Sequence, residues 1–243
     1  MICNFRTVVI ALVMLVLQTG CATNRSSLDP LEPFNRKIYS FNQGLDRVIV
    51  KPLTLSYQRH VPQPVRRGIG HFVGNLSEPT SALNHLLQGN PELATAGSLR
   101  FLINSTFGVV GLFDVATPLG LARHNEDFGQ TLALWGIPEG PYLVLPLLGP
   151  STARDTFGQL SQWALPDPLD IVSADTREVA LSRYSMTLLH WRSQLLPLDA
   201  LLAQQPDPYL FQYALYRQYR RDQIHDGSAP AEADILESEV LKD

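Results

Sequence analysis

Residues 29–49, DPLEPFNRKIYSFNQGLDRVI, contain the pattern that decides the fold. Asp29 can cap a helix, Pro30 suits its first position, and the acid that follows completes a typical helix start. Apolar side chains then recur at spacings of three and four residues, at Leu31, Phe34, Ile38, Phe41, Leu45 and Val48. This spacing places them along one face of a helix. The stretch therefore predicts an amphipathic helix from Leu31 to about Ile49, which Lys51-Pro52 is expected to end.

Further helices are predicted along the chain by the same periodicity and by start and stop signals. One apolar stripe runs from Val65 to Leu76, and Ser77 is expected to cap a short helix that Gly89 ends. The other expected helices cover residues 90–106, 151–163, 174–196 and 207–224. Because the connectors are rich in glycine and proline and no strand pattern is found, the sequence predicts an all-α fold.

Two segments differ from these amphipathic helices because they are apolar on nearly every side. Residues 107–121, FGVVGLFDVATPLGL, contain Asp114 as their only charge, and residues 141–150, PYLVLPLLGP, contain three prolines. Both are too short to span a bilayer, and neither alternates as a half-exposed strand does. They are interpreted either as buried core or as surface that lies against lipid, and the sequence alone leaves both interpretations open.

The composition excludes several classes of protein. With 45% hydrophobic residues and a net charge of −4, the chain of 243 residues is neither disordered nor basic enough to favour nucleic-acid binding. Two cysteines cannot form a disulfide scaffold. No catalytic or nucleotide-binding motif is found, and the loop at 123–127, RHNED, is interpreted as solvated because adjacent ligands rarely converge on a metal. The sequence therefore predicts no catalytic residue, no metal and no cofactor.

The N-terminus resembles a bacterial export signal. Arg6 precedes an uncharged run from Thr7 to Gly20, and Cys21 follows directly. The junction, LQTGC, resembles a lipobox, although Gln18 replaces its usual leucine and a plain secretory signal remains the alternative. We expect the signal peptide to be removed and Cys21 to be lipidated. Ala22, in place of an aspartate, favours the outer membrane.

The chain thus divides into four expected regions: a signal peptide at 1–20, a lipidated tether at 21–28, a helical domain at 29–224 and a tail at 225–243. The tail holds six acids against one lysine, so it is expected to be disordered. The last helix before it carries a stripe formed by Tyr209, Tyr213 and Tyr216. That stripe is interpreted either as an interfacial belt or as rings packed on the core.

Six blocks of the sequence, taken in order, resemble the MlaA/VacJ family of outer-membrane lipoproteins. They are DPLEPFNRKIYSFN (29–42), RHVPQPVRRG (59–68), NLSEP (75–79), RFLINSTFGVVGLFDVA (100–116), DFGQTLALWGIPEGPYLVLPLLGPSTARD (127–155) and QPDPYLFQYALYRQYR (205–220). One block alone would be a weak signal, whereas the ordered set is specific. Gln18 and the acidic tail depart from the family pattern.

The resemblance implies a non-enzymatic role in removing phospholipids that stray into the outer leaflet of the outer membrane. It implies a ring of amphipathic helices that lies in the inner leaflet around a polar path, anchored by lipid on the periplasmic side. The partners that it implies are phospholipid, a trimeric outer-membrane porin and a soluble periplasmic lipid carrier. A static scaffold or docking lipoprotein, and less favourably a lipid-modifying enzyme, remain alternatives.

For such a ring, we expect the outward faces of residues 31–49, 100–121 and 141–149 to meet acyl chains. The candidate lipid-facing residues are Phe34, Phe41, Phe107, Val109, Val110, Leu112, Phe113, Leu143, Val144, Leu145, Leu147 and Leu148.

Overall fold

The structure, a computed structural model, describes residues 29–164 and 176–225 of the chain. The expected signal peptide, Cys21 and the acidic tail beyond His225 lie outside the described residues. Helices dominate the described part, as the sequence predicts. In chain order the elements are α2 (Glu32–Leu45), the π-helical turn η1 (Asp46–Val50), α3 (Lys51–His60), α4 (Gln63–Leu87), α5 (Pro91–Thr106), the 3-10 turn η2 (Thr117–Leu119), α6 (Phe128–Leu134), β1 (Tyr142–Leu145), β2 (Gly149–Thr152), α7 (Ala153–Ala164), α9 (Thr176–Leu195), α10 (Leu198–Leu202) and α11 (Pro208–Ile224).

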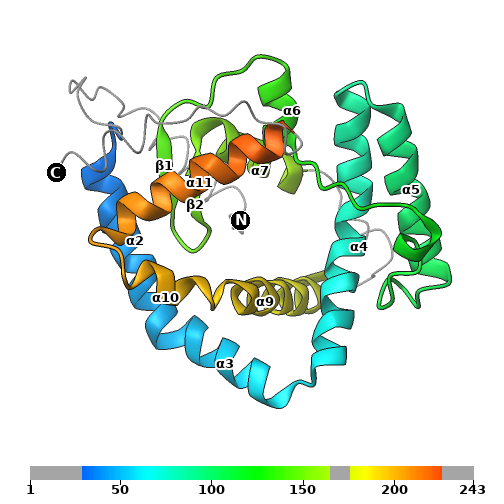
Figure 1. Cartoon of the computed structure of the whole chain (residues 1–243), viewed down its shortest axis with the longest axis horizontal. Coiled ribbons are helices and arrows are strands. Elements are labelled where there is room, and N and C mark those ends of the chain that lie inside the picture. The colour runs from blue at the N-terminus through cyan, green and yellow to red at the C-terminus, as the bar shows by residue number, and fades with distance from the viewer. Residues whose placement is uncertain (1–28, 165–175, 226–243) are drawn as a thin grey trace, which may run out of the picture.

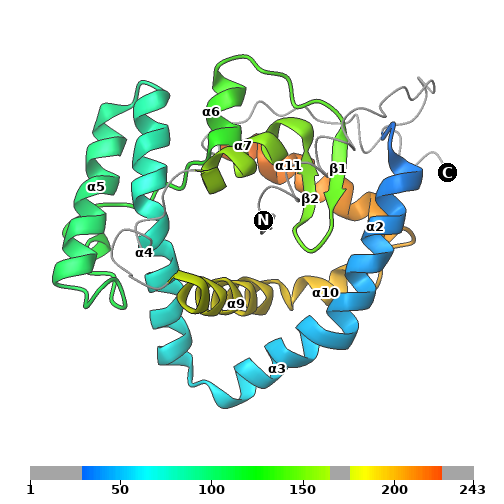
Figure 2. The same cartoon turned by 180° about the vertical axis from the view of Figure 1, so that it is seen from behind.

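The helices follow one another around a ring in both views (Figures 1 and 2). α2 forms one side of the ring, and α4 with α5 forms the opposite side. α9 and α10 run between these sides along one edge, while α11, the hairpin, α7 and α6 form the other edge. α3 lies outside α9 and α10 and joins α2 to α4 through an outer corner (Figure 1). None of the helices in the described ranges has the length and apolar character needed to cross a membrane.

The two ends of the described chain fasten the ring together. Asp207 caps α11 by accepting hydrogen bonds from the backbone N–H groups of Tyr209 and Leu210, at 3.0 and 3.2 Å. The same carboxylate pairs with Arg36 of α2. Tyr209 is fully buried and donates its hydroxyl proton to Asp29, just ahead of α2. The start of the last helix is therefore bound to the start of the first.

Proline at position 52 does not end the first helical path, so the expected helix end at Lys51-Pro52 is wrong. The chain widens into the π-helical turn η1, in which the N–H of Lys51 reaches the carbonyl of Asp46, five residues back. Pro52 then occupies an early position of α3, where it needs no hydrogen-bond donor. The helical path therefore continues as far as His60.

The boundary expected at Ser77 is also wrong, because α4 continues from Gln63 to Leu87 with Pro79 in its interior. The hydroxyl of Ser77 donates to the carbonyl of Gly74 at 2.8 Å and does not cap a new helix. Gly89, with a φ of +80°, ends the helix as the sequence predicts. α5 then begins at Pro91 and ends at Thr106, in agreement with its expected range.

The apolar segment at 141–150 forms most of an antiparallel hairpin, which the sequence analysis did not predict. Tyr142 pairs with Thr152 and Leu145 with Gly149, and Leu147 lies at the tip with a φ of +67°. Because β1 is buried on both faces, its sequence YLVL reads as a continuous apolar run without alternation. The all-α expectation therefore holds apart from this hairpin.

The helix after the hairpin starts two residues later than expected. Ser151 belongs to β2, and its hydroxyl lies 2.9 Å from the hydroxyl of Thr156. Thr152 accepts a hydrogen bond from the N–H of Asp155 at 3.2 Å, so its side chain caps the start of α7. α7 begins at Ala153.

Candidate functional site

The pair formed by α4 and α5 has an inverted distribution of polar and apolar side chains. Its buried residues include Asn75, Glu78, Asn84, Arg100 and Asn104. Its exposed residues include the large apolar side chains Val65, Leu83, Leu86, Leu87, Leu99 and Leu102. α2 follows the same pattern, since Asn35 is its one buried residue while Phe34 and Phe41 are exposed. Water-soluble helices bury the opposite face, so these helices suit surroundings that are themselves apolar.

The loop that follows α5 presents the most exposed aromatic side chains of this surface. Phe107 is 77% exposed and Phe113 is 62% exposed. Between them, Val109 and Val110 adopt left-handed conformations, with φ values of +52° and +56°. Such angles are unfavourable for β-branched residues and persist only where the surroundings impose them. The carbonyls of Asn104 and Gly108 impose them here by accepting hydrogen bonds from Gly111 and Phe113, at 2.7 and 2.9 Å.

Most, but not all, of the residues expected to face lipid are exposed in the structure. Nine are exposed, which is the condition for contact with lipid: Phe34, Phe41, Phe107, Val109, Val110, Leu112, Phe113, Leu147 and Leu148. Leu145 is partly buried. Leu143 and Val144 are only 7% and 2% exposed, because β1 lies between the helices that flank it. The expectation for these two residues is therefore wrong.

A buried ionic cluster holds α4 and α5 together beneath this apolar surface. Glu78 and Arg100 are each 2% exposed, and the guanidinium donates to the carboxylate at 2.9 Å. Arg100 also donates to the hydroxyl of Thr117 at 3.0 Å and reaches Asp114 at 3.4 Å. Burial acts to raise the pKa of Asp114, but hydrogen bonds from Thr117 and the charge of Arg100 hold it at about 2. The sequence analysis did not assign a role to these residues.

A second buried cluster joins three elements through Arg220 of α11. Its guanidinium contacts Asp127, which precedes α6, at 2.6 Å and Asp155 of α7 at 2.9 Å. Although burial acts to raise the pKa of Asp155, the hydrogen bonds and charge of Arg220 lower it below its ordinary value. A side chain at Gly129 would collide with this cluster, because its Cβ would lie 2.7 Å from the Asp155 carboxylate.

The tyrosine stripe of α11 belongs to the small apolar core and does not form an interfacial belt. Tyr209 and Tyr213 are buried together with Tyr142 and Val144. The rings of Tyr142 and Tyr213 meet edge to face with their centres 4.8 Å apart. Tyr216 packs against this core and donates to Asp155 at 2.7 Å. The alternative that placed these rings against the core is therefore correct.

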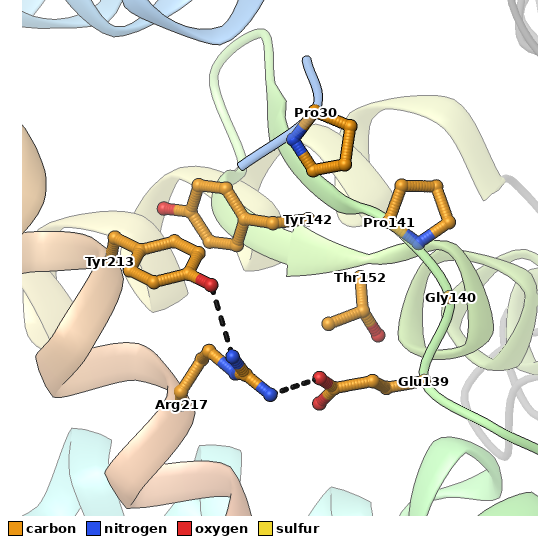
Figure 3. A pocket seen from close by; sticks show the side chains of 8 residues that line it. All are labelled: Pro30, Glu139, Gly140, Pro141, Tyr142, Thr152, Tyr213 and Arg217. Atoms are coloured by element: carbon orange, nitrogen blue, oxygen red, sulfur yellow. Dashed lines mark hydrogen bonds and ion pairs between the residues drawn. The ribbon is translucent and has the colours of Figure 1, made fainter. Parts of the chain in front are cut away.

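A pocket of about 340 Å³ lies between α11, the hairpin and Pro30, two residues ahead of α2 (Figure 3). Arg217 donates to Glu139 across the pocket and to the hydroxyl of Tyr213 at 3.0 Å. The side chains of Arg217 and Glu139 remain 35% and 40% exposed, so both charges stay accessible. The other lining residues are Pro30, Gly140, Pro141, Tyr142 and Thr152. A pocket with one cation, one anion and apolar walls is complementary to a small zwitterionic group.

The loop at 123–127 holds no metal-binding arrangement. Arg123 donates to the carbonyl of Gly74, and Glu126 accepts from Gln88 at 2.8 Å. Across residues 29–164 and 176–225, no three His, Cys, Asp or Glu side chains gather in a way that could hold a metal ion.

Comparison with known proteins places this geometry in context. The family model described as MlaA lipoprotein matches residues 27–223. The chain is 36% identical to the "Intermembrane phospholipid transport system lipoprotein MlaA" of Escherichia coli (strain K12), over 87% of this chain and 85% of that protein. It is 31% identical to the protein of the same name from Haemophilus influenzae, over 98% of each chain.

A solved structure is similar as well. It is described as "Structural basis for maintenance of bacterial outer membrane lipid asymmetry", and it superposes with a TM-score of 0.71 at 36% identity. The superposition covers 82% of this chain and 99% of that chain.

Proposed function

Because the chain belongs to the MlaA lipoprotein family, we propose that it acts in phospholipid transport at the bacterial outer membrane. In this role it gives phospholipids that have strayed into the outer leaflet a polar path toward a periplasmic carrier, and so maintains the lipid asymmetry of the membrane. The protein provides a path and performs no chemical step on the lipid.

The inverted helices carry this proposal. A phospholipid headgroup crosses hydrocarbon only at a high free-energy cost, because its charges lose their hydration. A protein lowers that cost if its outer surface is compatible with acyl chains and its inner groups are polar. The α4–α5 pair has this organisation, with leucines outside and the Glu78–Arg100 ion pair inside. Hydrophobic helix association contributes little within lipid, so buried polar contacts take over the task of holding the helices together.

The surface that contacts lipid comprises the exposed faces of α2 and α5, the loop at 107–113 and the hairpin tip. Leu147 and Leu148 at that tip are exposed, whereas the strand that leads to them is buried. The hairpin therefore touches lipid by its turn only. Its backbone groups pair within the hairpin and with the side-chain amides of Asn35 and Asn42 on α2, as backbone near hydrocarbon requires.

The pocket beside α11 is suited to the polar end of a phospholipid. The phosphate would take the place of Glu139 on Arg217, and an ammonium group would be attracted to the carboxylate and to the neighbouring tyrosine rings. Neutralising the pair as Arg217→Gln with Glu139→Gln should weaken binding of glycerophosphoethanolamine in a calorimetric titration. The matched control is Lys51→Gln with Asp199→Asn, an ion pair outside the pocket at 2.8 Å. Equal binding by both double variants would remove the pocket from the pathway.

We further propose lipidation at Cys21, a position in the inner leaflet, and partnership with a trimeric porin and a soluble periplasmic lipid carrier. These proposals rest on the signal-like N-terminus and on family membership. Cys21 directly follows a small residue and an apolar run, as lipidated cysteines do. The static scaffold remains the competing function, since it requires the same anchor but no path.

Two measurements test the proposal. In cells that lack this protein, the phospholipid content of the outer leaflet should rise, and it should fall when the intact chain is restored. Spin labels at Phe113→Cys and Leu148→Cys in the reconstituted protein should be relaxed by oxygen dissolved in the bilayer. A label at Gln218→Cys, an exposed polar position, serves as the matched control and should respond to a water-soluble nickel chelate. If that chelate reaches all three labels equally, the lipid-facing surface is refuted; an unchanged outer leaflet would instead favour the scaffold.

A further inference from the structure

The charged residues of the segment between Asp46 and Glu78 all have the same sign. It contains no aspartate or glutamate, whereas it contains five cationic residues: Arg47, Lys51, Arg59, Arg66 and Arg67. The complete chain is slightly acidic, with 23 acidic against 19 basic side chains. The positive charge of this segment is therefore a local feature.

Three of these cations meet at the outer corner between α3 and α4. Arg59 lies in the last turn of α3, while Arg66 and Arg67 lie in the first turns of α4. Figure 1 shows this corner projecting beyond α9 and away from the hairpin and α11. We call Arg59, Arg66 and Arg67 the basic corner. The N-terminal end of α4 adds the positive end of a helix dipole at the same place.

The basic corner has no acidic partner among the described residues. Lys51, further back on α3, pairs with Asp199 at 2.8 Å, and Arg47 lies a full helix away. No ion pair or hydrogen bond joins the side chains of Arg59, Arg66 or Arg67 to another described residue. α9 packs against both helices of the corner, and its described side chains from Tyr184 to Leu195 include no acid. The charged residue in this part of α9 is Arg192, which forms ion pairs with Asp46 and Asp199. The nearby titratable groups on α4 and α9 are His71 and His190.

Two polar atoms at the corner are buried without a hydrogen-bond partner. They are the Nε of Arg66 and the hydroxyl of Tyr57, and the two side chains interact electrostatically. A buried polar atom that lacks a partner costs roughly 1–3 kcal/mol, so native proteins rarely retain one without a reason. An anion drawn to Arg66 compensates the charge that the protein itself leaves unpaired.

Exposed apolar side chains surround the same cations. Leu53 and Leu55 of α3 and Val65 of α4 are each about half exposed. A helix that shows leucine and arginine together suits the boundary between acyl chains and headgroups, where each side chain finds its preferred surroundings. A site for a small soluble anion has no need of these apolar neighbours.

We propose that the basic corner binds the phosphate groups of anionic phospholipids, and so holds the α3–α4 side of the ring at headgroup depth. Guanidinium groups suit this task because their paired N–H donors match two phosphate oxygens. The inference rests on the proposed function, since it presumes that the ring lies in a leaflet. The inference adds a preference of the protein for anionic over neutral phospholipids, which the proposed path does not itself require.

The test uses the full lipoprotein in detergent, titrated with phosphatidylglycerol or phosphatidylcholine and followed by native mass spectrometry. The wild-type chain should bind phosphatidylglycerol more tightly. Arg59→Gln with Arg67→Gln should reduce that affinity about 25-fold, from roughly fivefold for each cation near a lipid surface, and leave phosphatidylcholine binding unchanged. The control Lys37→Gln with Lys242→Gln removes the same charge elsewhere and should have little effect. Arg66→Lys keeps the charge but loses the fork, and should have an intermediate effect.

Three outcomes would overturn the inference. Equal affinity of the wild-type chain for both lipids would do so, as would an equal loss in the control variant. Inorganic phosphate that competes better than chloride at equal ionic strength would assign the corner to a soluble anion. If the spin labels at positions 113 and 148 still report lipid in any of these cases, the proposed path stands and the basic corner alone is withdrawn.

Discussion

Asn35 and Asn42 lie seven residues apart on α2, and each side-chain amide forms two hydrogen bonds with the backbone of the hairpin. The amide of Asn35 donates to the carbonyl of Tyr142 at 3.0 Å and accepts from the N–H of Val144 at 2.9 Å. Asn42 repeats this arrangement with the carbonyl of Leu145 and the N–H of Leu147, both at 2.9 Å. Two helical turns thus satisfy the free edge of β1, as a neighbouring strand would.

Replacing Asn35 should detach the strand from the helix. Asn35→Leu leaves two buried backbone groups without partners, so we expect a loss of about 1–3 kcal/mol in the free energy of unfolding. Amide hydrogen exchange at Val144 should accelerate. Asn42→Leu, whose partner Leu147 is exposed, should cost less and serves as the graded comparison. Equal protection of Val144 in all three proteins would contradict the clamp.

Breaking the Glu78–Arg100 pair should be severe, because both side chains are buried. Arg100→Met leaves the buried carboxylate of Glu78 with Arg123, at 3.6 Å, as its remaining cation, and should destabilise the protein by about 3 kcal/mol. Adding Glu78→Leu removes that stranded charge and should recover much of the loss. Thermal unfolding in detergent measures both variants. A double variant less stable than Arg100→Met would show that the pair contributes more than charge compensation.

Acid should destabilise the protein through its paired carboxylates. The pKa of Asp114 is held at about 2, and the pKa values of Asp155 and Asp207 are also lowered in the folded state. A carboxylate with a lowered pKa contributes stability above its unfolded value of about 3.9, and this contribution is lost as the pH falls through the folded value. Stability should therefore be level near neutrality and decline between about pH 4 and pH 2. Asp114→Asn should flatten that decline, whereas Glu92→Gln, for which no partner is seen among the described residues, should leave it unchanged.

Relieving the backbone strain at Val109 and Val110 should change the stability of the protein and its contact with the membrane in opposite directions. Asparagine tolerates the left-handed conformation better than valine, so Val110→Asn should stabilise the folded chain by up to about 1 kcal/mol. The same change places a polar group on the exposed apolar loop and should weaken its contact with lipid. Unfolding in detergent and quenching of a nearby fluorophore by brominated lipid report the two effects. A variant that is stabilised and quenched as strongly as wild type would refute the loop's role at the membrane.

The exposed apolar surface should make the protein dependent on detergent. The Cys21→Ser chain lacks the expected lipid and should still aggregate when detergent is removed, because Phe107, Phe113 and many leucines remain exposed. Phe107→Ser with Phe113→Ser should reduce aggregation in light scattering while helical content stays constant. A monodisperse Cys21→Ser chain in plain buffer would support the scaffold function.

The sequence predicts local structure well where the signals are local. The periodicity after Leu31, the proline start at Pro91 and the stop at Gly89 all correspond to observed helix features. Pro52 does not end the helix as predicted, because the π-helical turn before it lets the helical path continue. This backbone adjustment leaves no signature in the sequence. The YLVL run misleads because a strand buried on both faces does not alternate.

The orientation of the helices is beyond local prediction for a different reason. A stripe of apolar residues shows which face differs, but not whether protein or lipid covers it. The partners of Asn35, Arg100 and Arg220 are decisive here, since they reveal that the polar faces point inward. Several of these contacts join residues far apart in the chain, such as Asn35 with Tyr142 and Arg220 with Asp127.

The inward-facing polar clusters also bear on how the chain reaches its destination. In water, collapse would bury the leucines and leave Glu78 and Arg100 outside, which is the reverse of the final arrangement. The native arrangement becomes favourable only when acyl chains, or another apolar surface, replace water around the exposed leucines. Folding is then coupled to membrane insertion. Between synthesis and insertion, the polypeptide must stay bound to a partner that shields its apolar side chains from the aqueous compartment that it crosses.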